Sequence, residues 1–200
     1  FLEQQPVSTR SSFFQMQGDL YISARLAKKT ALAINKGLGD RFEVFGITGI
    51  LPFNGYLKAG WFSPAYGLRM DDHNILTRSQ TLFAFGRGQD AGVEIAFSPG
   101  WLTLTGSVTN GSSLDRDNNR AKAVLGRAET QILLSPIGVR FGGSYYNNAG
   151  SVGTTTLYGA FAAASLGRNL TVLAEIDRRR QAEHASGITT TALVTFVEAD

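Results

Sequence analysis

Apolar and polar residues alternate with a period of two along many short stretches of this chain. Between residues 102 and 109 the even positions hold Leu, Leu, Gly and Val, whereas the odd positions hold Thr, Thr, Ser and Thr. A pleated strand produces this pattern, because its successive side chains point to opposite faces of a sheet. Similar alternation marks residues 19–28, 55–62, 137–147 and 170–178. The pattern therefore predicts a protein built mainly of β-strands.

We count eleven predicted strands and no amphipathic helix. The strands lie near residues 19–28, 30–36, 41–50, 55–62, 91–97, 101–109, 121–134, 137–147, 155–166, 170–178 and 188–198. In the last strand the apolar face is expected to carry Ile188, Ala192, Val194 and Phe196. No stretch approaches the roughly 18–20 apolar residues of a membrane helix. We expect an N-terminal segment, residues 1–18, followed by one β-domain over residues 19–200.

The predicted connections are alternately short and long. Short turns are expected at 28–30, 51–55, 98–100, 135–136 and 167–169, and longer connections at 35–41, 63–90, 110–120, 147–154 and 179–187. Outer-membrane barrels have short periplasmic turns and longer external loops, whereas a Greek-key sandwich has no reason for this alternation. The predicted fold is therefore an all-β, up-and-down antiparallel transmembrane β-barrel in a bacterial outer membrane, surrounded by lipid and lipopolysaccharide. A soluble β-rich binding protein is the alternative, because alternation alone does not say which face points inward.

Composition narrows the chemistry that the chain can perform. There is no Cys, so disulfides, thiolate metal sites and covalent haem attachment are excluded within this chain. The net charge of +3 comes from Lys and Arg spread along the whole sequence, which does not favour nucleic-acid binding. His73 and His184 are the only histidines and lie in separate predicted loops, which argues against a Ser–His hydrolase. We expect neither enzymatic activity, nor a metal, nor a cofactor.

One part of the chain resembles a known family of membrane channels. Residues 56–68, Tyr-Leu-Lys-Ala-Gly-Trp-Phe-Ser-Pro-Ala-Tyr-Gly-Leu, resemble the phosphate-selective porins, in which such a strand leads into a long loop. Similar features follow at 75–78, in the hairpin 90–111 and at 118–127, so the resemblance covers about 55–146. It implies a porin of about 16 strands, either trimeric or monomeric, of which this chain would be a part. An odd count of eleven strands agrees with an incomplete barrel, since single-chain bacterial barrels have even strand numbers. A 12-stranded barrel with one strand overlooked is the alternative.

Basic residues are the candidates for pore-lining or anion-binding groups. Four of them share parity with polar neighbours in the predicted strands: Lys58, Arg127, Arg140 and Arg179. The others, Arg69, Arg78 and Arg87, lie in the long loop after the fourth strand, a loop that in porins commonly folds inward and narrows the pore. Guanidinium groups in a narrow channel concentrate anions and bind oxyanions through paired hydrogen bonds. The other interpretation is that these groups pair with acids across the strands and brace the wall. The interleaved acids favour it; they are Glu43, Glu94, Glu129, Glu175 and Asp177.

Aromatic residues near the predicted strand ends are candidates for the girdles that mark the two membrane interfaces. They are Trp61, Trp101, Tyr145 and Tyr146. The expected function is passive diffusion of small hydrophilic solutes, with anions as the candidate preferred class. The alternative is a structural barrel that encloses a partner, such as a periplasmic multihaem cytochrome. A homo-oligomer, such as a trimer, is the other partner expected.

Overall fold

The computed structural model describes residues 20–37, 42–68, 81, 83, 88–112, 120–167 and 169–199. These residues form one eleven-stranded antiparallel sheet in which strands adjacent in the chain pair with one another. The strands are β1 (Leu20–Ala27), β2 (Thr30–Lys36), β3 (Phe42–Leu51), β4 (Gly55–Phe62), β5 (Asp90–Phe97), β6 (Leu102–Thr109), β7 (Ala123–Leu134), β8 (Ile137–Ala149), β9 (Gly153–Leu166), β10 (Leu170–Glu183) and β11 (Thr189–Ala199). The all-β, up-and-down prediction is confirmed. Among the described residues no helix is long and apolar enough to cross a membrane.

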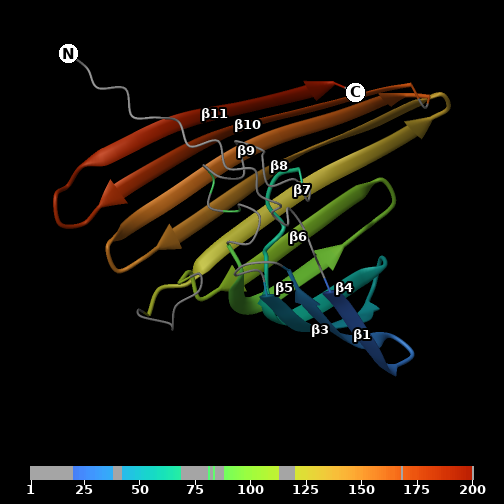
Figure 1. Cartoon of the computed structure of the whole chain (residues 1–200), viewed down its shortest axis with the longest axis horizontal. Helices are drawn as coiled ribbons and strands as arrows, with labels where there is room; N and C mark the ends of the chain where they lie inside the picture. Colours follow the sequence, from blue (N-terminus) through green and yellow to red (C-terminus); the bar gives the residue numbers. More distant parts are fainter. Residues whose placement is uncertain are drawn as a thin grey trace, which may run out of the picture.

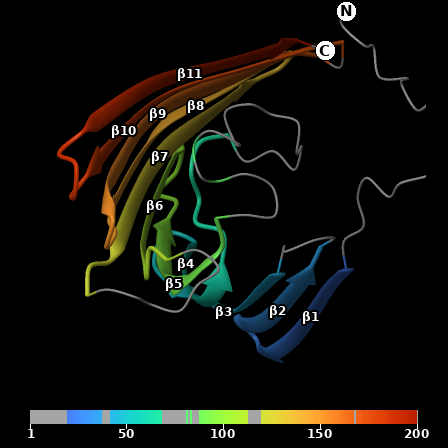
Figure 2. The ribbon, with the colours of Figure 1, turned by 60° about the vertical axis from the view of Figure 1, so that its left-hand side comes forward.

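The sheet curls into a trough instead of closing (Figures 1 and 2). Its two edges, β1 and β11, lie far apart on either side of the opening in both views. The predicted closed barrel is therefore not formed by the described residues. The strand count is one reason why the sheet stays open, because the first and last strands of an eleven-stranded meander run in the same direction. They cannot form an antiparallel seam with each other.

Several strands extend beyond their predicted ends on the side of the longer connections. Strand β10 continues to Glu183, and Arg179 pairs with Leu157 on one side and Ala192 on the other. The prediction that residues 179–183 belong to a loop is therefore wrong. Likewise, β8 and β9 leave only residues 150–152 between them, not the predicted 147–154. Polar side chains suggested loops here, but the backbone can continue its hydrogen-bonded ladder whatever the polarity of its side chains.

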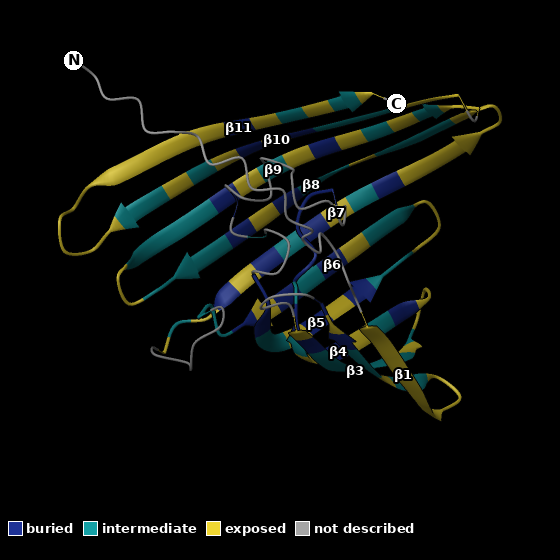
Figure 3. Ribbon diagram, viewed as in Figure 1, coloured by how far each residue is buried: buried dark blue, intermediate teal, exposed yellow. Residues whose placement is uncertain are grey.

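The two faces of the sheet show the reverse of the burial pattern expected in a water-soluble protein. On the concave face, charged side chains are buried: Glu94 and Asp177 are 0% exposed and Arg127 is 7% exposed. On the convex face, apolar side chains are exposed, with Val93 at 48% and Val108 at 49%. Buried and exposed residues alternate along the central strands (Figure 3). A one-sided antiparallel sheet in water buries its apolar face.

Strand β11 is oriented opposite to its prediction. Val194 lies opposite Asp177 and Phe196 opposite Glu175 in the β10–β11 register, so both point to the concave face. Leu193 and Val197 point to the convex face instead. Apolar residues occur at both parities of this strand, so the sequence pattern alone does not determine its orientation.

The extension of β10 gives a testable prediction about backbone protection. The amides of residues 178–182 are expected to exchange slowly with deuterium, because they lie between β9 and β11. Hydrogen exchange measured by mass spectrometry or NMR on the protein in detergent checks this. Ala185 and Ser186, at exposed positions in the β10–β11 connection, provide the fast-exchanging control. Equal rates in the two segments would contradict the assigned strand end.

Candidate functional site

After β4 the chain turns into the trough and lies against the concave face of the sheet (Figure 2). We call residues Ser63–Leu68 the docked segment. Residues 64–68 are all buried, and Tyr66 is only 1% exposed. Side chains from β3, β5, β7, β8 and β10 form hydrogen bonds with this segment. It therefore connects strands that are distant in the sequence.

The first half of the docked segment is held by two carboxylates. The backbone N–H of Ser63 donates to Glu43 Oε1 at 2.7 Å, and that of Ala65 donates to Glu94 Oε2 at 3.3 Å. Glu43 also accepts a hydrogen bond from Asn35 on β2. Hydrogen bonds from N–H groups to ionised carboxylates are stronger than those between neutral groups. These contacts fix the point where the chain enters the trough.

The second half is held at Gly67. Its N–H donates to Ser144 Oγ at 3.0 Å, and its carbonyl accepts from Arg127 Nε at 3.2 Å. Gly67 has a φ of +57°, which favours glycine, and a Cβ at this position would collide with the Glu175 carboxylate. Both conformation and space therefore require glycine at position 67.

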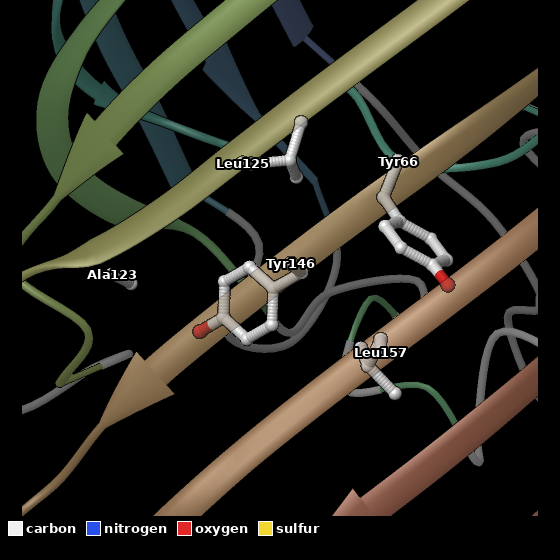
Figure 4. Packing of buried hydrophobic residues seen from close by; sticks show 5 residues of the cluster. All are labelled: Tyr66, Ala123, Leu125, Tyr146 and Leu157. Atoms are coloured by element: carbon white, nitrogen blue, oxygen red, sulfur yellow. The ribbon is translucent and has the colours of Figure 1, made fainter.

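Tyr66 lies between these two anchor points and reaches furthest across the sheet. Its hydroxyl donates to Asp177 Oδ1 at 2.9 Å, and a Cβ on Gly159 would collide with both groups. Its ring stacks on Phe83 with centroids 4.9 Å apart. Tyr66 belongs to a small buried cluster on the concave face (Figure 4); the other members are Ala123, Leu125, Tyr146 and Leu157. The missing side chain of Gly159 makes the space into which the hydroxyl fits.

Lys58 forms a buried ion pair beside the docked segment. Its Nζ lies 2.6 Å from Glu94 Oε1 and 4.1 Å from the centre of the Phe62 ring. Glu94 also accepts from the Tyr56 hydroxyl at 2.9 Å. This carboxylate thus holds both a cross-strand lysine and the backbone of the docked segment. The contacts agree with the wall-bracing interpretation of Lys58.

Arg127 and Arg140 share one carboxylate. Glu129 lies 2.8 Å from Arg127 Nη1 through its Oε1 and 2.6 Å from Arg140 Nε through its Oε2. The Arg127 guanidinium also lies over the Phe161 ring at 4.8 Å. The side chain of Arg127 is 4% exposed, whereas that of Arg140 is 37% exposed. Arg127 therefore braces the wall and holds Gly67, while Arg140 remains accessible from the trough.

The other predicted basic residues are not assembled into this site. Arg179 lies on the concave side of β10, where its Nη2 donates to Gln181 Oε1 at 2.6 Å. Arg69, Arg78 and Arg87 lie outside the described residues. The structure therefore brings together Arg127 and Arg140, and places Lys58 at the other end of the docked segment.

Two of the four predicted girdle residues, Trp61 and Tyr145, lie on the convex face. Trp101 is 70% exposed at the short-turn end of the sheet, while Trp61 and Tyr145 lie toward the opposite end. Tyr146 follows Tyr145 in the same strand, so it points to the concave face and joins the buried cluster there. Tyr158, which the sequence prediction omitted, pairs with Tyr145 at a ring separation of 5.2 Å.

Phe53 is another exposed aromatic residue that sequence reasoning missed. It is 64% exposed in the β3–β4 turn and has a φ of +54°. A bulky residue is uncommon in this conformation, which costs on the order of 1–3 kcal/mol.

The porin resemblance implied that the loop after the fourth strand folds inward, but the contacts that hold the docked segment were not predicted. Residues 63–90 lack a period, and the partners that hold the segment are up to 111 positions away, as in the Tyr66–Asp177 hydrogen bond. The one sequence signal was the pair Pro64 and Gly67, which favours a fixed turn geometry. Among the described residues, no group of three or more His, Asp or Glu side chains could hold a metal ion.

Comparison of the chain with family models, with curated proteins and with solved structures finds no match. The resemblance of residues 55–146 to phosphate-selective porins therefore stays a prediction from sequence.

The ion pair at Lys58 gives a prediction about stability. Lys58→Met is expected to lower the free energy of unfolding by about 3–5 kcal/mol, because it leaves the buried Glu94 carboxylate without its cation. The double variant Lys58→Met with Glu94→Gln is expected to recover part of that loss, since no uncompensated charge remains. Urea unfolding in detergent, followed by tryptophan fluorescence, measures both.

Lys28→Met, at an exposed turn, is the matched control and is expected to change stability by less than about 0.5 kcal/mol. An equally small effect of Lys58→Met would show that the pair does not stabilise the wall.

Proposed function

We propose that this chain forms the wall of a porin-like channel in a bacterial outer membrane, through which small hydrophilic solutes diffuse passively. The observation that carries the proposal is the inverted sheet: buried charges on its concave face and exposed apolar residues on its convex face. A transmembrane barrel has this polarity, because lipid surrounds its outer face and water fills its interior. A soluble β-rich protein would expose the convex apolar residues to water at a large hydrophobic cost.

The dimensions of the apolar surface support the same proposal. On β8, Ile137 near the short turn and Tyr145 toward the other end both point to the convex face. Eight residues span about 26 Å along a strand, or about 20 Å along the membrane normal at a tilt of about 40°. That is close to the apolar band of outer-membrane barrels. Aromatic residues lie toward its two borders, with the exposed Trp101 at one and the exposed Tyr145 and the partly buried Trp61 at the other.

The docked segment favours a channel over a barrel that encloses a partner. It lies across the concave side of β3 to β10 and buries Tyr66 against the wall. An enclosed protein would need this surface for its own contacts. A narrow aqueous passage requires only that part of the interior stay open. A segment of the chain fixed to the wall would narrow such a passage without blocking it.

A charge on the convex face separates the membrane proposal from the soluble alternative. Val108→Arg is expected to lower stability in lipid bilayers by about 2–3 kcal/mol, because the guanidinium would face hydrocarbon. Val152→Arg, in the exposed β8–β9 connection, is the control and is expected to change stability by less than about 0.5 kcal/mol. Unfolding by urea in phospholipid vesicles measures both. A Val108→Arg variant that is as stable as the wild type, or more soluble without detergent, would contradict the membrane proposal.

Conductance tests the channel directly. The wild-type protein, reconstituted in planar bilayers, is expected to conduct ions in discrete steps. Tyr66→Ala is expected to raise the single-channel conductance, because the docked segment loses its hydrogen bond to Asp177 and its ring contacts. Tyr158→Ala, on the convex face, is expected to leave the conductance unchanged. A stable inserted protein that passes no current would favour the sheath alternative instead.

A further inference from the structure

We propose that the convex face of β9 to β11 carries a binding site for one anionic membrane lipid. The phosphate group of this lipid contacts Arg178 and Arg180 on β10, and one of its acyl chains lies in an apolar hollow beside them. The site is on the opposite face of the sheet from the docked segment. It rests on the proposed location of the convex face in a membrane, and not on conduction through the trough.

The hollow has a volume of about 270 Å³ and is lined mainly by apolar residues. Those that point to the convex face form two rows of the strand register; they are Ala160, Ile176 and Thr195, then Ala162, Ala174 and Val197. In the row between them, Phe161, Glu175 and Phe196 point to the concave face, so no side chain fills the space on the convex side. The alanines deepen the hollow further, because a methyl group projects little from the sheet.

Two arginines lie next to the hollow along β10. Arg178 comes two positions after Ile176 and Arg180 two positions later, so both point to the convex face, about 7 Å apart along the strand. Both are exposed, and neither has a hydrogen-bond or ion-pair partner among the described residues. They are also the only charged residues at the convex positions of β8 to β11. A phosphate group there would meet two cations and no competing carboxylate from these strands.

The convex face changes from apolar to aromatic to polar along these strands. Beyond the apolar rows of the hollow, Arg178 pairs with Tyr158, which pairs with Tyr145 at a ring separation of 5.2 Å. In the next row Arg180 lies beside Thr156. A bilayer changes in the same order, from hydrocarbon through an interface rich in Tyr and Trp to charged headgroups. An arginine costs little near that border, so the hollow is at the depth of acyl chains and the two guanidinium groups are at the depth of headgroups.

The combination of an apolar hollow and a basic pair selects the class of ligand. A guanidinium presents parallel N–H donors whose spacing matches the oxygens of a phosphate. The ligand therefore needs both a phosphate group and an acyl chain, and a net negative charge, because the cation of a zwitterionic headgroup would be repelled by the two arginines.

A second copy of the chain fits the patch less well than a lipid does. A symmetric contact would place the same patch on both copies. The arginines of the two copies would then face one another, with no carboxylate at the convex positions of β8 to β11 to compensate them. Charge complementarity therefore favours an anionic lipid.

Native mass spectrometry of the full chain in detergent micelles, titrated with phosphatidylglycerol, tests the site. The wild type is expected to retain one molecule of this lipid and to prefer it to phosphatidylcholine by about tenfold. Arg178→Gln with Arg180→Gln is expected to weaken phosphatidylglycerol binding by about tenfold or more and to remove the preference. Ala162→Leu is expected to weaken the binding of both lipids, because it fills the hollow without changing the net charge.

Lys28→Gln with Lys29→Gln is the matched control. It removes the same two charges from the exposed β1–β2 turn and is expected to leave phosphatidylglycerol binding within about twofold of the wild type. All the substituted positions are exposed, and circular dichroism checks that each variant keeps its strands.

Equal weakening by the arginine and lysine double variants would overturn the site in favour of diffuse attraction by net charge. Displacement of the lipid by inorganic phosphate would overturn it in favour of a site for the free anion. A wild type that retains no lipid but forms an oligomer that Ala162→Leu dissociates would overturn it in favour of a second copy.

Lipid binding and conduction are measured separately, so the two proposals can fail separately. A protein that retains phosphatidylglycerol through Arg178 and Arg180 but passes no current contradicts the channel and keeps the site. A conducting protein that shows no preference for phosphatidylglycerol contradicts the site alone.

Discussion

Charged side chains buried on the concave face must find partners, and this requirement determines how the interior of the trough is arranged. A buried charge without a partner costs several kcal/mol, so each carboxylate there needs a cation or hydrogen-bond donors. Glu94 obtains them from Lys58, from Tyr56 and from the backbone of Ala65. The docked segment thus stabilises the wall that holds it. The charged wall and the inward course of the chain after β4 depend on each other.

The convex face is subject to the opposite requirement. Its valines, leucines and aromatic rings need surroundings without water, which the described residues do not provide. An ordinary soluble sheet would meet both requirements by placing the apolar residues inside. Here the two faces are exchanged, which is the reason for proposing an apolar environment outside the sheet. The alternation in the sequence indicates one apolar and one polar face of the sheet. Only the structure shows that the apolar face is the convex one, and the membrane proposal rests on this.

The strands were predictable because they depend on local pattern. The alternation in residues 102–109 is sufficient to identify β6, and short turns such as 98–100 fix its neighbours. Strand β11 shows where local pattern is insufficient. Val194 and Phe196 are apolar but point inward, because their register with Asp177 and Glu175 fixes their direction. That information lies in the neighbouring strand and not in β11 itself.

The candidate site was predictable in its residue types and not in its arrangement. Lys58, Arg127 and Arg140 were identified from their parity with polar neighbours. The parity of a residue does not say whether its side chain is covered. Arg127 is enclosed by Glu129, Phe161 and Gly67, whereas the side chain of Arg140 stays accessible. The docked segment makes this difference. That segment covers Arg127 and leaves Arg140 open. Two arginines with the same sequence signal therefore have different physical roles.

The free edges place a further constraint on any channel formed with this sheet. The backbone N–H and C=O groups along the outer edges of β1 and β11 would be unpaired in hydrocarbon, where each unsatisfied group costs several kcal/mol. Since β1 and β11 run in the same direction, an antiparallel closure requires an odd number of strands between them, whichever chain supplies those strands.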